Sequence, residues 1–295
     1  MTDIEGEETR ANLIGSLWMV LAMIGFAIED ALLKGLTISQ PVAQVLVTFG
    51  VVGLVAFAII ANLRREPVLI RAAISPAMCV RYVFEIGGRL FYVLALALTP
   101  LSSTTAILQA TPIVLVAGAA LFFGETVGWR RWSAVGFGLI GVLVVLKPAG
   151  DSFTILSILA VLGMLGFAGR DLASRAAPAA LSTSALGVYG FLSLIIAGSL
   201  YGFWEQRPFV APTGEEIAVL GAAVVFGIVA YSSLMLAMRT GEVSAVAPFR
   251  YSRLLFGIGL GVLWFGESVD LQMVIGCTMI VVSGLYILWR GKRVA

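Results

Sequence analysis

Ionisable side chains inside strongly apolar segments are the residues of this chain that could do chemistry. Arg81, Glu85 and Arg89 step by four, so on a helix they form one stripe, with Tyr92 three residues further on. Charges kept in apolar surroundings are costly unless they are paired or hydrated, and so are expected to be used. One carboxylate can bridge two guanidiniums but cannot neutralise both. We expect this stripe to line a polar cavity; the alternative is a buried ion-pair clamp that locks helix packing.

A second group of polar side chains lies in other apolar runs. Arg250 and Arg253 share one face of a predicted helix, and Gln109 on an earlier helix opposes them. The alternative for the two arginines is that they extend toward water at a helix end. Tyrosines in these runs can stack on a planar substrate. The predicted substrate-binding residues are Arg81, Tyr82, Glu85, Arg89, Tyr92, Gln109, Tyr231, Arg250, Tyr251 and Arg253.

One charged stretch occurs twice in the chain. Residues 20–34 match residues 161–175 at an offset of 141, with seven of fifteen positions identical. Each copy places an acid four residues before a base inside an apolar segment. A second match, between the Phe-Gly-Glu sequences of residues 123–125 and 265–267, has an offset of 142. The chain is therefore a duplicated unit over nearly its whole length.

The charged groups of the repeated stretch are predicted to act in gating or coupling. Acid and base can pair within each copy, as Asp30 with Lys34 and Asp171 with Arg175, or can be shared with a facing helix; the alternative is that each pair only neutralises a helix end. The chain contains no histidine, so proton coupling would need a carboxylic acid, while substrate exchange and facilitated flux stay open. The predicted gating or coupling residues are Glu29, Asp30, Lys34, Arg170, Asp171 and Arg175.

Composition identifies the environment of these groups. The chain is 60% hydrophobic and 12% charged, with a mean hydropathy of +1.02, so it has more apolar surface than a soluble core of this length could bury. We expect an all-α polytopic membrane protein. Cys79 and Cys277 lie apart in apolar runs and indicate neither a disulfide nor a metal site. Without a histidine or a nucleophile motif, neither an enzyme nor a cofactor is expected.

The elements that must position these residues are apolar runs of spanning length. Nothing in the runs alternates with period two, so each is expected to be a transmembrane helix. The ten predicted spans are 13–34, 40–62, 76–98, 101–122, 129–147, 153–175, 180–203, 216–238, 245–265 and 270–290. They divide into a first five-helix repeat, 13–148, and a second, 149–290, with tails at 1–12 and 291–295.

Basic residues predict the orientation. Eleven lysines and arginines fall in the tails and alternate connections, against three on the other face, which places both termini in the cytoplasm. Because each repeat has an odd number of helices, the second enters the membrane from the opposite side. Inverted duplication of this kind is typical of secondary transporters, and a receptor or scaffold would not need it.

Several motifs carry a resemblance to a known family. Residues 98–112, from Leu98-Thr-Pro-Leu-Ser to Ala-Thr-Pro112, are followed by a Phe-Phe-Gly-Glu sequence ending at Glu125 and by Lys147-Pro148, and they resemble an EamA module. Residues 246–251 (Val-Ala-Pro-Phe-Arg-Tyr) with 265–267 resemble a second one. The chain thus resembles the drug/metabolite transporter superfamily over its full length. The resemblance implies two modules and ten helices, and it leaves amino-acid exporters, riboflavin carriers and S-adenosylmethionine carriers open.

The expected function follows from the charge balance of the central segments. Arginines outnumber the acids in their middle and cytoplasmic half, so a substrate with a carboxylate or phosphate is favoured. We expect an inner-membrane carrier of a small anionic or zwitterionic metabolite, with export of amino acids, including aromatic ones, first, and uptake of a riboflavin-like or S-adenosylmethionine-like compound as the alternative. The expected partners are this small molecule and membrane lipid, not nucleic acid, and the expected state is a monomer, with a homodimer as the alternative.

Two kinds of backbone feature are predicted to support movement and packing. Pro112 and Pro248 are expected to act as hinges, because proline removes a helical hydrogen bond; for Pro112 the freed acceptor is the Leu108 carbonyl. Gly257 and Gly261 form a GxxxG pattern on the face that follows Arg253, which predicts close approach of another helix.

Overall fold

The computed structural model describes residues 2–98, 107–146, 156–265 and 271–291. All regular structure in this part of the chain is helical, which confirms the predicted class. The helices are α1 (Thr2–Leu36), α2 (Val42–Leu63), η1 (Arg71–Ile74), α3 (Pro76–Leu98), α5 (Thr111–Phe123), α6 (Trp129–Leu146), α7 (Ser157–Arg175), α8 (Thr183–Glu205), α9 (Gly214–Arg239), α10 (Val243–Val246), η3 (Ala247–Tyr251), α11 (Ser252–Phe265) and α12 (Leu271–Gly291).

Apolar helices of spanning length make this a multi-pass membrane protein. Within the described ranges, five stretches are long and apolar enough to cross a bilayer: Gly6–Leu33, Val42–Leu63, Ser157–Arg175, Thr183–Glu205 and Gly214–Arg239. Helix α3 is long enough, but it carries the charged stripe. Helices α5 and α11 are shorter, at 13 and 14 residues. Ten spans therefore stay a prediction.

The predicted helix boundaries need three corrections. Residues 2–12, expected as a tail, continue α1 as a helix. Of the span expected at 101–122, residues 101–106 lie outside the described ranges; residues 107–108 are helical, a turn follows at 109–110, and α5 begins at Thr111. The span expected at 245–265 is interrupted: α10 ends at Val246, and the 3-10 segment η3 separates it from α11.

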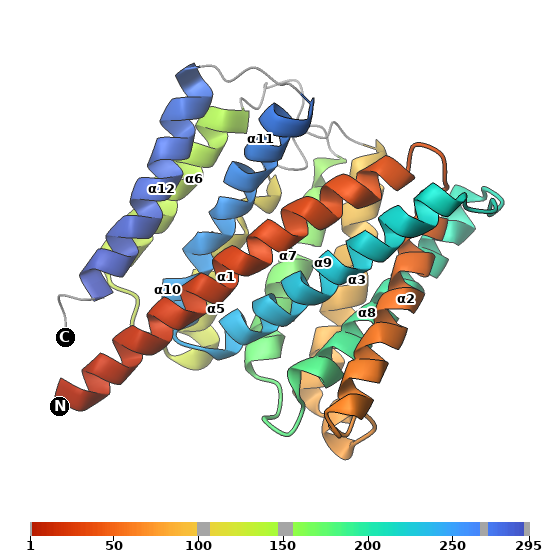
Figure 1. The fold of residues 1–295 in the computed structure, drawn as a ribbon. Coiled ribbons are helices and arrows are strands. Elements are labelled where there is room, and N and C mark those ends of the chain that lie inside the picture. The colour runs from red at the N-terminus through yellow and green to blue at the C-terminus, as the bar shows by residue number, and fades with distance from the viewer. Residues whose placement is uncertain (1, 99–106, 147–155, 266–270, 292–295) are drawn as a thin grey trace.

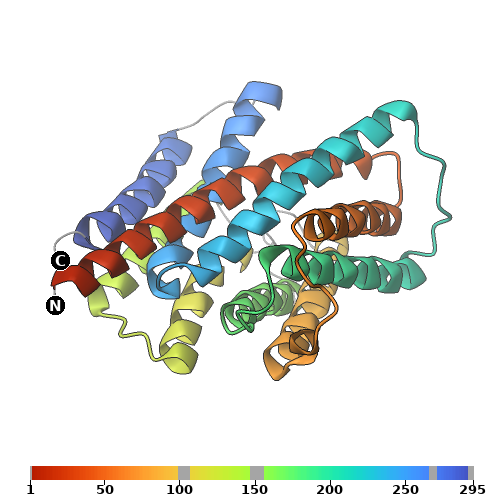
Figure 2. The ribbon, with the colours of Figure 1, turned by 60° about the horizontal axis from the view of Figure 1, so that its bottom comes forward.

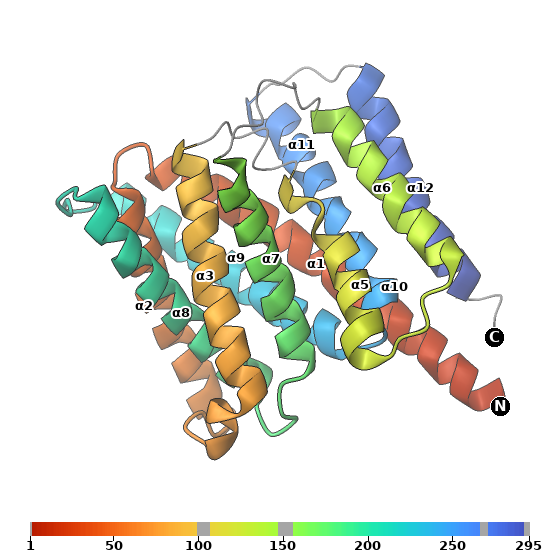
Figure 3. The same cartoon turned by 180° about the vertical axis from the view of Figure 1, so that it is seen from behind.

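Helices from the two halves of the chain pack against each other in pairs. Helix α3 packs mainly on α7, α1 on α9, α2 on α8, and α6 on α12. Figure 2 shows α1 beside α9 and α2 beside α8, and Figure 3 shows the other two pairs. If α1, α2, α3, α5 and α6 are exchanged in order with α7, α8, α9, α11 and α12, this set of pairs maps onto itself. Helices α1 and α7, which carry the repeated stretch, run in opposite directions along the bundle (Figures 1 and 3).

Close approach of α3 and α7 depends on glycine. A Cβ at Gly166 would lie 2.3 Å from the Cα of Gly88, and a Cβ at Gly163 would lie 3.0 Å from the backbone nitrogen of Tyr92. Two backbones can approach this closely only where side chains are missing. The predicted GxxxG does not have this role at Gly257, where a Cβ would meet nothing within 4 Å.

Carboxylates join the two halves of the chain at both ends of the bundle. After α5, the Glu125 carboxylate accepts hydrogen bonds from the backbone N–H groups of Val243 and Ser244, at 2.8 and 2.9 Å, where α10 begins. At the end of α8, Glu205 accepts from the first two N–H groups of α2, at 3.0 and 2.8 Å. An acid at a helix N-terminus satisfies unpaired donors and complements the helix dipole. Each half thus caps a helix of the other.

The helices turn aliphatic side chains outward and aromatic rings toward the core. Val51, Val55 and Ile59 point outward from α2, as expected for a face in contact with lipid. Toward the interior, the rings of Phe49, Phe57 and Phe191 are almost completely buried and contact one another at centroid distances of 5.2 and 5.5 Å. These aromatic rings border the polar centre.

Candidate functional site

A chain of buried ion pairs crosses the centre of the bundle. Glu85 of α3 contacts Arg81 at 3.0 Å and Arg170 of α7 at 3.2 Å. Arg170 also contacts Asp171 at 2.8 Å, and the other oxygen of Asp171 pairs with Arg250 of η3. Three guanidiniums therefore share two carboxylates, so one positive charge is left over in this chain. Hydrogen bonds to the remaining donors and acceptors offset the cost of burying such pairs. Within the residues that the structure describes, Arg81 Nη1 is buried without a hydrogen-bond partner.

Helix α9 supplies the group that satisfies the first part of the ion-pair chain. The Tyr231 hydroxyl accepts a hydrogen bond from Arg81 and lies 3.1 Å from a Glu85 oxygen, to which it donates. A Cβ at Gly190 would come within 2.1 Å of this hydroxyl, so only glycine leaves room for it. Arg81 Nε donates to the Ser174 hydroxyl at 3.0 Å. Arg81 is 0% exposed, which makes it part of the packing.

Arg89 is placed differently from the other arginines of the core. The sequence predicted that Glu85 could bridge Arg81 and Arg89, but Glu85 takes Arg170 in place of Arg89. Among the described residues, Arg89 has no hydrogen bond or ion pair. Its guanidinium carbon lies 5.6 Å from the centroid of the Phe167 ring, a cation–π contact. Arg89 therefore keeps all of its donors for another partner.

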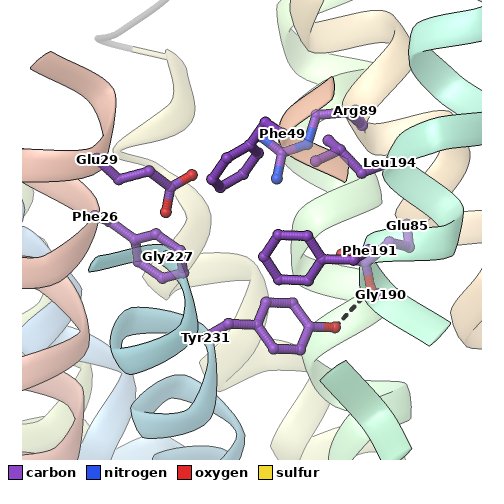
Figure 4. Close-up of a pocket in the computed structure, with 10 residues that line it drawn as sticks. All are labelled: Phe26, Glu29, Phe49, Glu85, Arg89, Gly190, Phe191, Leu194, Gly227 and Tyr231. Atoms are coloured by element: carbon purple, nitrogen blue, oxygen red, sulfur yellow. Dashed lines mark hydrogen bonds between the residues drawn. The ribbon is translucent and has the colours of Figure 1, made fainter. Parts of the chain in front are cut away.

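A pocket lies between helices of both halves, next to the ion-pair chain. The residues that line it are Phe26, Glu29, Phe49, Glu85, Arg89, Gly190, Phe191, Leu194, Gly227 and Tyr231 (Figure 4). The space available to the centres of water molecules is about 20 Å³, enough for a single water but not for a metabolite. The aromatic rings fill the rest. In this conformation little free space is left around the polar groups of the pocket.

Glu29 of α1 is the acid of this pocket. It is 4% exposed, and in the described part of the chain its carboxylate makes no hydrogen bond and no ion pair at contact distance. Arg89, Arg170 and Arg253 are the cations that act on it through space, and Asp30 is the neighbouring anion. A Cβ at Gly227 would lie 3.3 Å from a Glu29 oxygen, so the bare face of α9 leaves that side of the carboxylate free.

Asp30 joins α1 to α11 beside this pocket. Arg253 Nε donates to an Asp30 oxygen at 3.0 Å, and the Arg253 guanidinium lies 5.3 Å from the centroid of Phe26. The side chains of Asp30 and Arg253 are 52% and 33% exposed. This pair is the solvent-exposed counterpart of the buried pair of Asp171 and Arg250, and both connect a repeated acid to the segment 250–253.

In this conformation Asp171 does not pair with Arg175, four residues away, and the pairing of Asp30 with Lys34 stays a prediction. Asp30 pairs with Arg253, and the Lys34 side chain lies outside the described residues. Asp171 pairs with Arg170 and Arg250, while Arg175 donates to the Met238 carbonyl at 3.3 Å. Glu29 and Asp30 also lie among the central arginines, so the positive surplus is smaller than the sequence indicated.

Four other predicted binding residues do not line the pocket. The Tyr82 hydroxyl donates to the Ala73 carbonyl at 2.9 Å, and the buried Tyr251 donates to the Val135 carbonyl at 3.2 Å. Gln109 precedes α5 and is half-buried. Tyr92 packs edge-on against Phe167, with centroids 5.6 Å apart, and so supports the ring under Arg89. Of the predicted binding residues, Glu85, Arg89 and Tyr231 line the pocket.

The sequence did not identify the aromatic wall of the pocket. Phe49 and Phe191 sit in uniformly apolar helices, where nothing local separates a pocket residue from a core residue. Phe26 carried a signal, because its counterpart in the repeat is Phe167. Each of these two rings lies under an arginine from the other half of the chain, Phe26 under Arg253 and Phe167 under Arg89.

The two predicted hinge prolines begin helical segments. Pro112 stands in the first turn of α5, and the Leu108 carbonyl that it leaves free accepts a hydrogen bond from the Thr111 hydroxyl. Pro248 stands in the first turn of η3. A missing N–H is tolerated in a first turn, where it has no helical partner. The hinge role of both prolines stays a prediction.

The model of the EamA-like transporter family matches residues 13–147 and again residues 154–289. A riboflavin transporter of Rhizobium johnstonii is 26% identical over 99% of this chain and 96% of its own length. The pseudopaline exporter CntI of Pseudomonas aeruginosa is 27% identical over 91% and 94%, and an S-adenosylmethionine uptake transporter of Rickettsia felis is 23% identical over 70% and 69%.

A solved crystal structure supports the fold. It covers 97% of this chain and 99% of its own, with a TM-score of 0.75 and 21% sequence identity. At this identity the likeness extends to the fold alone.

Proposed function

Because the chain belongs to the EamA-like transporter family, we propose that it is a secondary carrier that moves a small zwitterionic or anionic metabolite across the inner membrane by alternating access. The family model matches twice, so the chain contains two related modules. Membership also makes it a small-molecule transporter by family rather than an enzyme. The mode of coupling and the roles of the site residues are proposed as well.

The proposed topology has ten spans in two inverted repeats, 13–148 and 149–290, between tails at 1–12 and 291–295. Two observations support it: α1 and α7 run in opposite directions, and the helix pairs map onto themselves when the halves are exchanged. The beginning of α1 and the end of α12 lie at the same end of the bundle (Figure 1). With the excess of basic residues on that side, this favours cytoplasmic termini.

The proposed binding site rests on the absence of a hydrogen-bond or ion-pair partner for Arg89 among the described residues. A half-buried guanidinium without a hydrogen-bond or ion-pair partner in the described ranges points into a pocket that helices of both halves build. Arginine binds a carboxylate with two parallel hydrogen bonds, which gives both energy and orientation. We assign Arg89 to the carboxylate of the substrate, and Glu85 and Tyr231 to the adjacent wall.

The small volume of the pocket supports alternating access. A space of about 20 Å³ cannot admit a metabolite, so helices or aromatic side chains must move before one binds. The 3-10 segment η3 interrupts the helix between α10 and α11 and contacts α5, so it lies where such movement is less restrained by α-helical hydrogen bonds.

Substrate identity has two candidates. An amino acid, including an aromatic one, fits an arginine and a carboxylate surrounded by aromatic rings, and we place its export first. The alternative is uptake of riboflavin or of an S-adenosylmethionine-like compound. It is supported by the similarity to a riboflavin transporter and to an S-adenosylmethionine uptake transporter.

Counterflow in proteoliposomes tests the carrier function. Vesicles loaded with unlabelled phenylalanine, riboflavin or S-adenosylmethionine are diluted into the labelled compound. We expect saturable uptake that loading stimulates, for at least one compound, since only a carrier exchanges substrate across a membrane. Protein-free vesicles are the control for leakage. Uptake that neither saturates nor responds to loading, for all compounds, would contradict the proposal.

A further inference from the structure

Within the described part of the core, Glu29 is a buried carboxylate that packing does not explain. Burying a carboxylate without a partner is strongly unfavourable, so such a group is retained where a cation or proton meets it. Glu29 was predicted from the sequence as a gating or coupling residue. The structure places it in the pocket wall, on α1, in the same pocket as Arg89 of α3 (Figure 4).

The other charged groups of the centre each contact at least one group of opposite charge. Arg81, Arg170 and Arg250 share Glu85 and Asp171, and Arg253 holds Asp30. This leaves one cation and one anion without a contact partner in the described part of the core. Both line the same pocket, and they come from different helices. Together they offer one positive and one negative binding group to whatever enters.

We propose, on the premise that the protein is a carrier, that Glu29 and Arg89 recognise the two charged ends of a zwitterion. Glu29 accepts hydrogen bonds from the protonated amine of the substrate, and Arg89 donates to its carboxylate. The rings of Phe26, Phe49 and Phe191 lie beside them and contact the apolar or planar part. An ammonium near an aromatic face gains a further electrostatic attraction.

Selectivity follows from the two opposite charges. A substrate with a carboxylate but no amine would leave Glu29 buried without a cation and close to a second anion. A substrate with an amine but no carboxylate would leave Arg89 unpaired. Each singly charged substrate therefore binds less well than the zwitterion, because one charged group of the protein is left without a partner.

Matched ligands test this assignment on the purified full-length protein. L-phenylalanine, 3-phenylpropionate and phenethylamine share a ring and a chain but carry both charges, only the carboxylate, or only the amine. S-adenosylmethionine serves as a second zwitterion. Binding is measured by the change in tryptophan fluorescence and by thermal stabilisation. We expect at least one zwitterion to bind about tenfold or more tighter than the singly charged analogues, which corresponds to about 1.4 kcal/mol.

Two conservative variants separate the roles of the pair. Glu29→Gln keeps the shape of the side chain and should weaken zwitterion binding to the level of 3-phenylpropionate, with little loss for 3-phenylpropionate itself. Arg89→Gln should weaken zwitterion binding to the level of phenethylamine, with little loss for that amine. Equal weakening of all ligands by Glu29→Gln would assign Glu29 a structural role and overturn the proposal.

A glycine pair on α9 provides a test that leaves the charges intact. Gly227→Ala places a methyl group 2.8 Å from the Phe49 ring and 3.3 Å from a Glu29 oxygen, so it should weaken zwitterion binding. Gly221→Ala is the matched control, because its Cβ meets nothing within 4 Å. The pair should differ in binding while both proteins stay folded. Equal binding by the two variants would contradict the placement of the zwitterion beside Gly227.

Failure of this inference is distinguishable from failure of the carrier function. If riboflavin shows counterflow but neither zwitterion binds the unmodified protein, the carrier stands and the zwitterion site is overturned. If no compound shows counterflow, the carrier proposal fails first. Zwitterion binding no tighter than that of either singly charged analogue also overturns the inference.

Discussion

Arg81 and Arg89 lie on the same stripe of α3, and the structure surrounds them in opposite ways. Arg81 is fully buried and contacts the Ser174 hydroxyl, the Leu186 carbonyl, the Tyr231 hydroxyl and the Glu85 carboxylate. Arg89 is half-buried and stacks on Phe167, without a hydrogen bond or ion pair to the described residues. One arginine therefore belongs to the packing and the other is available to a substrate.

This contrast predicts different effects of the same substitution. Arg89→Ala should reduce transport of a carboxylate substrate far more than it reduces the amount of folded protein in the membrane. Arg81→Ala should reduce folded protein itself, because Glu85 would lose one cation and Tyr231 a donor, at about 3–5 kcal/mol for a broken buried pair. The measurement is counterflow rate divided by the folded fraction from size-exclusion chromatography. Proportional loss of transport and folded protein in Arg89→Ala would return the whole stripe to a structural role.

The two repeated acids are predicted to bias the carrier in opposite directions. Asp30 forms a partly exposed ion pair with Arg253, and Asp171 forms a buried ion pair with Arg250. If inward and outward states break these pairs alternately, Asp30→Asn and Asp171→Asn should shift the populations of the two states in opposite senses. Labelling of single cysteines near each end of the bundle measures the shift, in a background without Cys79 and Cys277. Shifts of the same sign, or none with transport intact, would count against alternating pairs.

The interruptions at the two prolines are predicted to be flexible points. Alanine at position 112 or 248 restores an N–H and favours a more continuous helix. We expect slower transport and lower reactivity of cysteines placed nearby. Pro212→Ala, in the exposed connection before α9, is the control and should change neither quantity. Unchanged transport and labelling in both Pro112→Ala and Pro248→Ala would remove the hinge role.

Close packing of α3 on α7 is predicted to tolerate a methyl group at one glycine and not at its neighbour. A Cβ at Gly88 would lie 2.9 Å from the backbone of Gly166, whereas a Cβ at Gly87 meets nothing within 4 Å. Gly88→Ala should destabilise the protein by about 1–3 kcal/mol through overpacking. Gly87→Ala should be neutral or slightly stabilising, because alanine favours helix. Thermal unfolding in detergent measures both, and equal midpoints would contradict the close approach.

Several features of this protein could be predicted because they depend on local sequence. The hydropathy of the runs predicted membrane helices, and the match of residues 20–34 to 161–175 predicted two related modules, as the family comparison confirms. The spacing of Arg81, Glu85 and Arg89 predicted one polar stripe that lines a cavity. Glu85 and Arg89 do line the pocket, whereas Arg81 is buried in the packing. Phe49 and Phe191 could not be assigned, since a ring in an apolar helix has the same local pattern whether it faces lipid, core or pocket.

What the sequence by itself determined is the set of charges and the helices that carry them, because helical periodicity and the exclusion of polar groups from lipid act within each segment. Only the tertiary structure decided which charges meet. Glu85 binds Arg170 rather than Arg89 because α3 and α7 approach closely at Gly88 and Gly166, and a contact between helices then replaces one along a helix. The same packing leaves Glu29 and Arg89 without contact partners in the described core, and no local spacing in the chain encodes that.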